Sequence, residues 1–159
     1  MKLGLNPVMP EDEFLWQMLV YAAHETSLKA VKTHPILLKY VAGWGKVGDT
    51  GIVAMLDQHP LGAAWLRLWD GETKGYGYFD DATPELATGV LPEYRGQGIG
   101  TQLLKQIIVV ARGNFPAISL SVRPDNPAVN LYQRFGFVES KSRRHLNRVG
   151  GYSLTVYRF

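Results

Sequence analysis

The segment Val90-Leu-Pro-Glu-Tyr-Arg-Gly-Gln-Gly-Ile-Gly-Thr-Gln-Leu-Leu-Lys105 restricts the possible folds of this chain more than any other part of the sequence. Residues 86–90, which lead into it, are predicted to form a strand. Glycines at positions 96, 98 and 100 follow, and then apolar residues recur with the spacing of one helical face, at 103, 104, 107, 108 and 111. The segment therefore predicts a strand, a glycine-rich turn and a helix in direct succession.

A turn of this kind suits a phosphate or pyrophosphate ligand. Its backbone N–H groups converge at the start of a helix, where the helix dipole adds partial positive charge. Glycine permits positive φ angles and lets a ligand approach the backbone closely. Two common phosphate motifs do not fit. Gly100 is followed by Thr-Gln instead of Lys-Ser/Thr, and about 20 residues on, where a dinucleotide site needs an acid, stands Leu120-Ser121.

The pattern that does fit is Arg95-x-x-Gly98-x-Gly100 preceded by Val90-x-Pro92, which resembles the pyrophosphate-binding motif of the GNAT N-acetyltransferase superfamily. Residues 126–137 are similar to its second motif, N-x-x-A-x-x-L-Y-x-x-x-G-F. The matching residues are Ala128, Leu131, Tyr132, Gly136 and Phe137. The motif's Asn falls on Asp125, one residue before Asn126, so the sequence departs from the motif at the start of this helix.

The resemblance implies an α/β (α+β) fold: a mixed, mostly antiparallel sheet of six to seven strands with a central splayed parallel pair, flanked by about four helices. A chain of 159 residues is expected to form one domain, here 1–159. Around the central motif we expect strands at 2–5, 51–56, 61–69, 117–122, 137–138 and 152–158. Helices are expected at 11–24, 35–43 and 128–135, and the segment 25–34 is expected to be loop.

The resemblance also implies the co-substrate, acetyl-CoA, and the residues that hold it. Its pantetheine arm would bind backbone groups of Thr88, Gly89 and Val90, and Asn126 is a further candidate contact. Its pyrophosphate would bind the N–H groups of the turn, contributed by Arg95, Gly96, Gln97, Gly98, Ile99, Gly100 and Thr101. No metal is expected.

The implied reaction is direct attack of an acceptor amine on the thioester in a ternary complex. Tyr132 occupies the superfamily's usual position for the acid that protonates the departing thiolate. An N–H near Val90 would stabilise the oxyanion. Glu85 is the candidate general base because it is the nearest acid on the strand, but alternation along the strand turns it away from the usual face. A water chain is the alternative base.

The expected function is therefore acetyl-CoA-dependent transfer of an acetyl group to a primary amine of a small molecule or peptide. The missing base keeps a second hypothesis open, a non-catalytic sensory module that binds CoA or acyl-CoA. Candidate acceptor contacts are His24, Tyr40 and Trp44 near the first helices, and an aromatic, acidic mouth formed by Trp65, Trp69, Tyr76, Tyr78 and Asp80.

The distribution of charge along the chain indicates which kinds of ligand it binds. Residues 1–94 carry 7 Lys/Arg and 12 Asp/Glu, whereas residues 95–159 carry 10 and 2, a split that suits a polyanionic cofactor and a cationic acceptor. The basic stretch 141–148 would either meet the CoA 3′-phosphate or be solvated. Basic residues are not interleaved with aromatics as in nucleic-acid modules, so no nucleic acid is expected.

The chain lacks cysteine, a signal sequence and a long apolar run, so we expect a cytoplasmic protein without a membrane partner. A homodimer is kept as an alternative to a monomer, since the final strands would suit pairing between copies.

Overall fold

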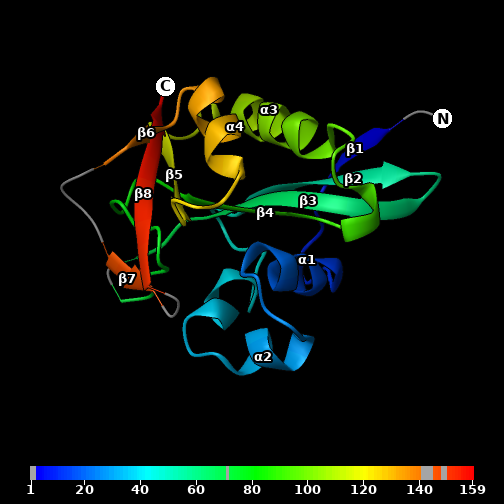
Figure 1. Cartoon of the computed structure of the whole chain (residues 1–159), viewed down its shortest axis with the longest axis horizontal. Helices are drawn as coiled ribbons and strands as arrows, with labels where there is room; N and C mark the ends of the chain where they lie inside the picture. The colour runs from blue at the N-terminus through cyan, green and yellow to red at the C-terminus, as the bar shows by residue number, and fades with distance from the viewer. Residues whose placement is uncertain (1–2, 71, 141–144, 148–149) are drawn as a thin grey trace.

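The computed structural model describes residues 3–70, 72–140, 145–147 and 150–159, and shows a sheet covered by helices on both faces (Figure 1). Its helices and 3-10 turns are α1 (Phe14–Ala22), α2 (Leu28–Thr33), η1 (Leu37–Tyr40), η2 (Pro92–Tyr94), α3 (Ile99–Ala111) and α4 (Ala128–Phe135). Its strands are β1 (Gly4–Pro7), β2 (Thr50–Leu56), β3 (His59–Arg67), β4 (Glu85–Val90), β5 (Ala117–Val122), β6 (Val138–Glu139), β7 (His145–Asn147) and β8 (Gly150–Arg158).

The strands form one mixed sheet in the order β1-β2-β3-β4-β5-β8-β6, with β7 paired to β8. Every neighbouring pair is antiparallel except β4 and β5, which are parallel. The long connection through α3 explains this exception, because parallel neighbours need a crossover that packs on one face. The predicted α/β architecture with a central parallel pair is confirmed.

The parallel pair separates almost at once. Its only residue pairing is Glu85 with Ser119, where the Ser119 N–H donates to the Pro84 carbonyl at 3.0 Å. By contrast, β3 and β4 are paired along all six residues of β4. Beyond the Glu85–Ser119 pairing the carboxyl ends of β4 and β5 diverge and leave a gap in the middle of the sheet.

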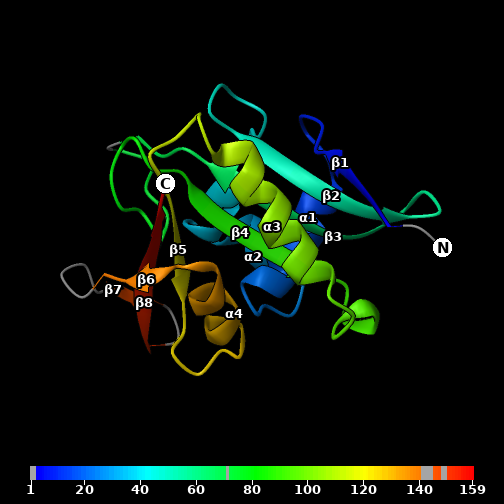
Figure 2. The same ribbon diagram turned by 90° about the horizontal axis from the view of Figure 1, so that it is seen from above.

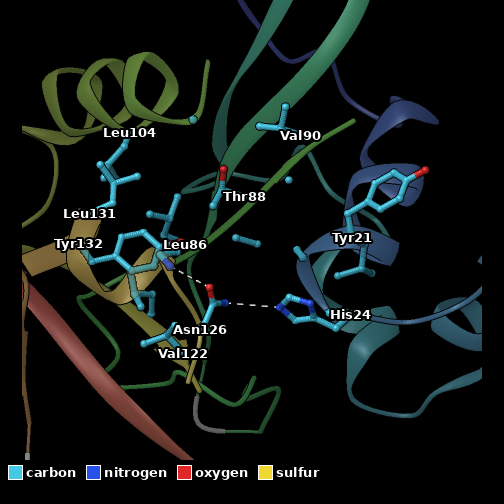
Figure 3. A pocket seen from close by; sticks show the side chains of 18 of the residues that line it. Tyr21, His24, Leu86, Thr88, Val90, Leu104, Val122, Asn126, Leu131 and Tyr132 are labelled. Atoms are coloured by element: carbon cyan, nitrogen blue, oxygen red, sulfur yellow. Dashed lines mark hydrogen bonds between the residues drawn. The ribbon is translucent and has the colours of Figure 1, made fainter. Parts of the chain in front are cut away.

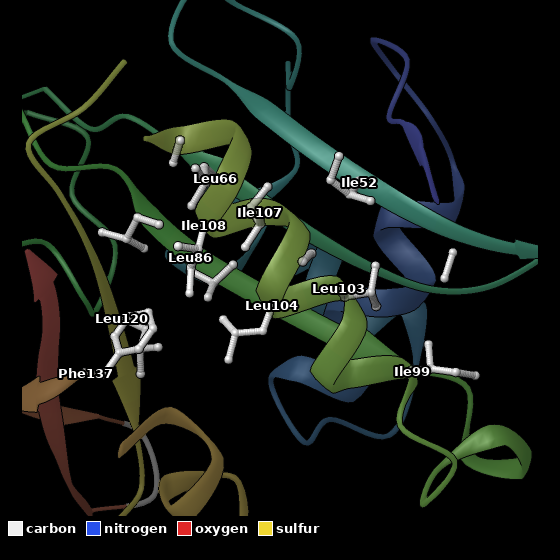
Figure 4. Close-up of a cluster of buried hydrophobic side chains, with 14 of the residues drawn as sticks. Ile52, Leu66, Leu86, Ile99, Leu103, Leu104, Ile107, Ile108, Leu120 and Phe137 are labelled. Atoms are coloured by element: carbon white, nitrogen blue, oxygen red, sulfur yellow. The ribbon is translucent and has the colours of Figure 1, made fainter. Parts of the chain in front are cut away.

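Helices α3 and α4 cover one face of the sheet, and α1 and α2 cover the other (Figures 1 and 2). The predicted apolar stripe of α3 is buried against the sheet (Figure 4): Ile99, Leu103, Leu104, Ile107, Ile108 and Ala111 pack with residues of β2 to β5. On the opposite face, α1 packs into a second cluster built around the fully buried Trp65 and Met18. The two clusters hold the gap between β4 and β5 at the centre of the molecule.

Two expectations for the region between α1 and β2 are wrong. The segment 25–34 is not loop, because Ser27 accepts the Ala30 N–H at 3.1 Å as an N-cap and starts α2, whose Val31 is buried. The expected helix 35–43 is only the four-residue turn η1. The His34 ring accepts the N–H groups of Ile36 and Leu37, both at 3.1 Å, and these side-chain bonds favour a tight turn at this point.

The ends of other elements move by a few residues. Strand β3 stops at Arg67 instead of 69, and α1 is shorter than the expected 11–24. At this end of β3 the Arg67 guanidinium donates to the carbonyls of Lys39 and Ala42 and lies 3.5 Å from Asp49. Of the basic stretch 141–148, residues 141–144 and 148 lie outside the described residues, as do the side chains of β7.

Candidate active site

The gap between β4 and β5 opens into a cavity of about 820 Å³ (Figure 3). Its walls come from the end of α1, from η1, from β4 and β5, and from the first turns of α3 and α4. Ligand sites in open α/β sheets lie at the carboxyl ends of parallel strands, where neighbouring connections run to opposite faces. The position of this cavity agrees with that rule.

The glycine-rich turn forms one end of the cavity, which Gly96, Gly98 and Gly100 all line. Gly96 and Gly98 have φ angles of +76° and +81°, which residues other than glycine rarely adopt. A Cβ at any of the three would meet no atom within 4 Å, so the space in front of the turn is open. The first N–H groups of α3 have no acceptor within the helix and form the positive end of its dipole. The turn thus has the shape and polarity of a pyrophosphate cradle.

Two side chains of this turn are bonded to the backbone around it. The Arg95 Nε donates to the Val90 carbonyl at 3.2 Å, and its guanidinium lies 5.4 Å from the centre of the Tyr21 ring. The Gln97 amide reaches the Glu93 carbonyl at 3.5 Å and does not line the cavity. Arg95 and Thr101 line the cavity, and Ile99 joins them although its side chain is mostly buried in the core.

The edge of β4 that faces the gap offers backbone groups. Because the Leu91 N–H donates to Leu61 of β3, alternation directs the N–H and C=O groups of Thr88 and Val90 away from β3, toward β5. The backbone of Gly89 is directed toward β3 instead. A Cβ at Gly89 would lie 2.6 Å from the Met18 carbonyl, so the glycine is needed for α1 to pack closely on β4.

Tyr132 lies on α4 and lines the cavity from the side opposite α1 (Figure 3). Its ring packs edge-on against Phe137, with 5.7 Å between centroids. Burial raises the pKa of the Tyr132 phenol to about 12, so the hydroxyl keeps its proton at neutral pH. A proton donor therefore faces the cavity.

Asn126 and His24 lie across the cavity from each other (Figure 3). The Asn126 amide oxygen accepts the Ala128 N–H at 2.9 Å and starts α4, while its nitrogen lies 3.4 Å from His24 Nε2. His24 has a φ of +54°, at the point where the chain leaves α1. The contact joins the end of α1 to the start of α4.

Glu85 lines the cavity as well, although strand alternation had suggested that it points elsewhere. The strands part immediately after this residue, so a side chain on the α1 face still reaches the gap. Its carboxylate is almost fully buried and accepts hydrogen bonds from the Tyr40 hydroxyl at 2.6 Å, Trp69 Nε1 at 2.8 Å and the Gly77 N–H at 3.0 Å. Burial raises the pKa of Glu85 to about 7, and the three donors partly oppose that shift.

The loop between β3 and β4 forms part of this site. A Cβ at Gly75 or Gly77 would come within 2.7 Å of the Glu85 carboxyl group, so both glycines are required for the loop to pass over it. The Gly77 carbonyl accepts the Ser119 hydroxyl at 2.6 Å, which fastens the loop to β5. The sequence analysis named Tyr76, Tyr78 and Asp80 of this loop but missed its contact with Glu85. The signal was Gly-Tyr-Gly within a run of acidic residues.

The candidate acceptor contacts divide into two groups. His24, Tyr40 and Tyr76 line the cavity, and the Tyr40 hydroxyl accepts the Tyr76 N–H at 2.8 Å. The predicted aromatic mouth is otherwise wrong, because its remaining members do not line the cavity: Trp65, Trp69, Tyr78 and Asp80. Trp44 does not line it either, and with Trp65 and Trp69 it is buried in the core.

Two other kinds of site are not seen in the described part of the chain. No three His, Asp or Glu side chains there gather closely enough to bind a metal ion. No helix in the same residues has the length and apolar content needed to cross a bilayer.

Comparison with known proteins agrees with this geometry. Over 64 residues the chain is 44% identical to the N-alpha-acetyltransferase RimI of Mycobacterium tuberculosis (strain ATCC 25618 / H37Rv), a match that covers 40% of this chain and only 39% of that protein. The structure of yncA from Salmonella typhimurium with its cofactor acetyl-CoA superposes with a TM-score of 0.70 at 17% identity, covering 99% of this chain and 94% of the other. An N-acetyltransferase from Staphylococcus aureus Mu50 gives 0.68 at 16% identity, covering 100% and 98%.

These structural neighbours share the fold. The family itself is shown by sequence, because the model of the acetyltransferase (GNAT) family matches residues 14–137, which include both motifs, Glu85 and the helices that line the cavity. The chain belongs to the acetyltransferase (GNAT) family.

Proposed function

We propose that this protein is an N-acetyltransferase that uses acetyl-CoA to acetylate a primary amine of a small molecule or peptide. One observation carries the proposal: the open glycine turn, the buried Glu85 and the protonated Tyr132 all line a single cavity. An anion site alone would suit any phosphate ligand. A base and an acid at the same cavity favour acyl transfer.

The residues present fit acetyl-CoA. The turn from Arg95 to Thr101 would hold the pyrophosphate on its N–H groups, since nothing fills the space in front of its glycines. The pantetheine arm would pair with the exposed backbone of Thr88 and Val90, like a short added strand, with Gly89 between them. Asn126 would close the arm from the α4 side. When bound, acetyl-CoA supplies an activated acetyl thioester.

The protein's own residues would then manage the protons. Glu85 accepts three hydrogen bonds, and a carboxylate offers about four lone-pair positions, so one position on Oε2 is left for the acceptor amine. With a pKa near 7, Glu85 can take a proton from an ammonium at neutral pH. The Val90 N–H, directed into the gap, would stabilise the oxyanion, and Tyr132 would protonate the thiolate.

The second candidate is a CoA-binding sensory module. It has less support, because a binding module does not need a buried acid that forms no ion pair with any residue the structure describes. Calorimetry with acetyl-CoA and release of free thiol in the presence of an amine panel separate the two candidates. We expect micromolar to millimolar binding together with amine-dependent thiol release that the Glu85→Gln variant largely loses. Binding without release for any amine would support the sensory module, and absence of binding would remove both candidates.

A further inference from the structure

The end of the cavity around Glu85 has a chemistry of its own. Tyr40 donates to Glu85 and accepts the Tyr76 N–H, Leu19 and Leu37 also line the cavity, and the one other carboxyl group among its described lining residues, that of Glu25, lies beyond the end of α1. Leu37 and Tyr40 belong to η1, and Tyr76 comes from the loop that passes over Glu85. The surface that a substrate would contact at this end is therefore apolar and aromatic, apart from one buried acid.

Positive charge lies at the opposite end. Among the described residues that line the cavity, the only lysines or arginines are Arg95 and Arg123. Arg95 is bonded to the Val90 carbonyl, and five residues of extended chain separate Val90 from Glu85, about 16 Å. Arg123 follows the end of β5, four residues after Ser119, the partner of Glu85. Neither arginine is positioned to neutralise a second carboxylate beside Glu85.

From this distribution we infer that the acceptor is a primary amine on an apolar or aromatic stem that carries no carboxylate next to the amino group. The inference rests on the proposed acetyl transfer and names its substrate class. The cationic amine would approach Glu85 Oε2, and the stem would lie against Leu37 and Tyr76. Aromatic rings also attract a cation that stands over their faces. An α-amino acid would place its own carboxylate next to Glu85, where no lysine or arginine among the described lining residues can compensate it.

The transfer step balances. The ammonium gives one proton to Glu85 and becomes a neutral amine, whose nitrogen lone pair forms the N–C bond with the acetyl carbon. The C–S bond breaks with its electron pair on sulfur, which takes a proton from Tyr132. The second proton on nitrogen restores the Tyr132 phenol, and Glu85 releases the first proton to solvent. An ammonium and a thioester thus yield an amide, a thiol and one released proton.

Three matched amines test the inference: phenethylamine, phenylalanine amide and phenylalanine. Thiol release is measured at pH 8, where Glu85 is ionised, with saturating acetyl-CoA. We expect kcat/KM for phenylalanine to be about 100-fold below that for phenethylamine, the factor for two like charges roughly 6 Å apart at an effective dielectric constant of about 20. Phenethylamine is the stronger base and supplies less neutral amine, so basicity alone would give the opposite order.

Calorimetry with the CoA-bound protein gives a second readout that does not need turnover. Phenylalanine should bind about 100-fold more weakly than phenethylamine, and the Glu85→Gln variant should reduce that ratio to a few-fold. Equal binding, preferred binding of phenylalanine, or no binding of any amine overturns the inference. If the binding order holds but no amine releases thiol, the acceptor site stands and acetyl transfer fails. A kcat/KM for phenylalanine amide that exceeds that for phenethylamine after both are divided by the neutral fraction of the amine at pH 8 would identify a peptide N-terminus as the natural source of the amine.

Discussion

Replacing Tyr40 by Phe tests the role of the hydrogen bonds around Glu85. The variant keeps the ring, which packs edge-on against Trp69 with 5.2 Å between centroids, and removes the hydroxyl that donates to Glu85 Oε2 at 2.6 Å. A hydrogen bond to a charged group is worth roughly 1.5–3 kcal/mol. At 1.36 kcal/mol per pKa unit, its loss should raise the pKa of Glu85 by about 1–2 units, from about 7 to about 8–9.

The pKa of Glu85 rises in this variant because the lost hydrogen bond stabilises only the ionised form. The Tyr40 hydroxyl favours the carboxylate, so its removal favours the protonated acid, which cannot act as a base. At pH 7 the ionised fraction of Glu85 should fall from about half to between about 1% and 10%. The value of kcat/KM should then fall by about 5- to 50-fold at pH 7 and recover at high pH.

The assay is the pH profile of kcat/KM for phenethylamine from pH 5.5 to 9.5, with saturating acetyl-CoA. Ionisation of the amine affects both proteins equally, so the ratio of variant to wild type isolates Glu85. Tyr157→Phe is the matched control, because Tyr157 lies on β8 and does not line the cavity. A ratio that does not change with pH would refute the proposed role of Tyr40, whatever its absolute value.

Three further predictions concern other parts of the site. Gly100→Ala should stabilise the apo protein by up to about 1 kcal/mol, because Gly100 is helical and its added Cβ would meet open space. The same Cβ should raise the Kd for acetyl-CoA tenfold or more. Thermal unfolding measures the stability and calorimetry the Kd, and an unchanged Kd would contradict the pyrophosphate cradle. Tyr132→Phe should lower kcat about 100-fold with little change in cofactor affinity, whereas parallel loss of both would indicate a packing role. Because the pKa of Glu85 rises from 4.5 to about 7 on folding, the unfolded chain binds fewer protons between these values, and stability should fall by about 3 kcal/mol as pH rises through that window. Denaturant titrations of wild type and Glu85→Gln at pH 4.5 and 8 measure this difference, and identical pH dependence would count against it.

The central part of the fold was predictable because local pattern and tertiary role agree there. The glycines of the turn, the apolar stripe of α3 and Gly136 at the end of α4 each follow from local rules, and the structure places them as expected. The single pairing of β4 with β5 followed from the family resemblance. It could not follow from composition, because the residues of the two strands are ordinary strand formers.

The acceptor side was less predictable because long-range contacts decide it. Trp69 was predicted to contact the acceptor directly, but it is buried and its indole N–H is bonded to Glu85, 16 positions later. Tyr40 lies 45 positions from the carboxylate that it contacts. Alternation placed Glu85 on the face opposite Leu86, where it lies, but that rule assumes a continuous sheet and could not show that the side chain still reaches the gap where β4 and β5 part. In each case the residue type was noted and the contact partner was not.

The solitary pairing between Glu85 and Ser119 divides the sheet into two ribbons. Hydrogen bonds hold each ribbon together internally, but few hydrogen bonds cross the break, and the two ribbons share the apolar cluster to which α3 contributes Leu104 and Ile108. The spacing of the ribbons is thus fixed by the size of a few aliphatic and aromatic groups. A pantetheine arm seated between them would supply the missing rungs of the ladder. The bound cofactor would then supply hydrogen bonds that the sheet lacks between β4 and β5. Replacing an aliphatic core residue beside this gap by a smaller one would change the distance between the two ribbons, and with it the rate of acetyl transfer.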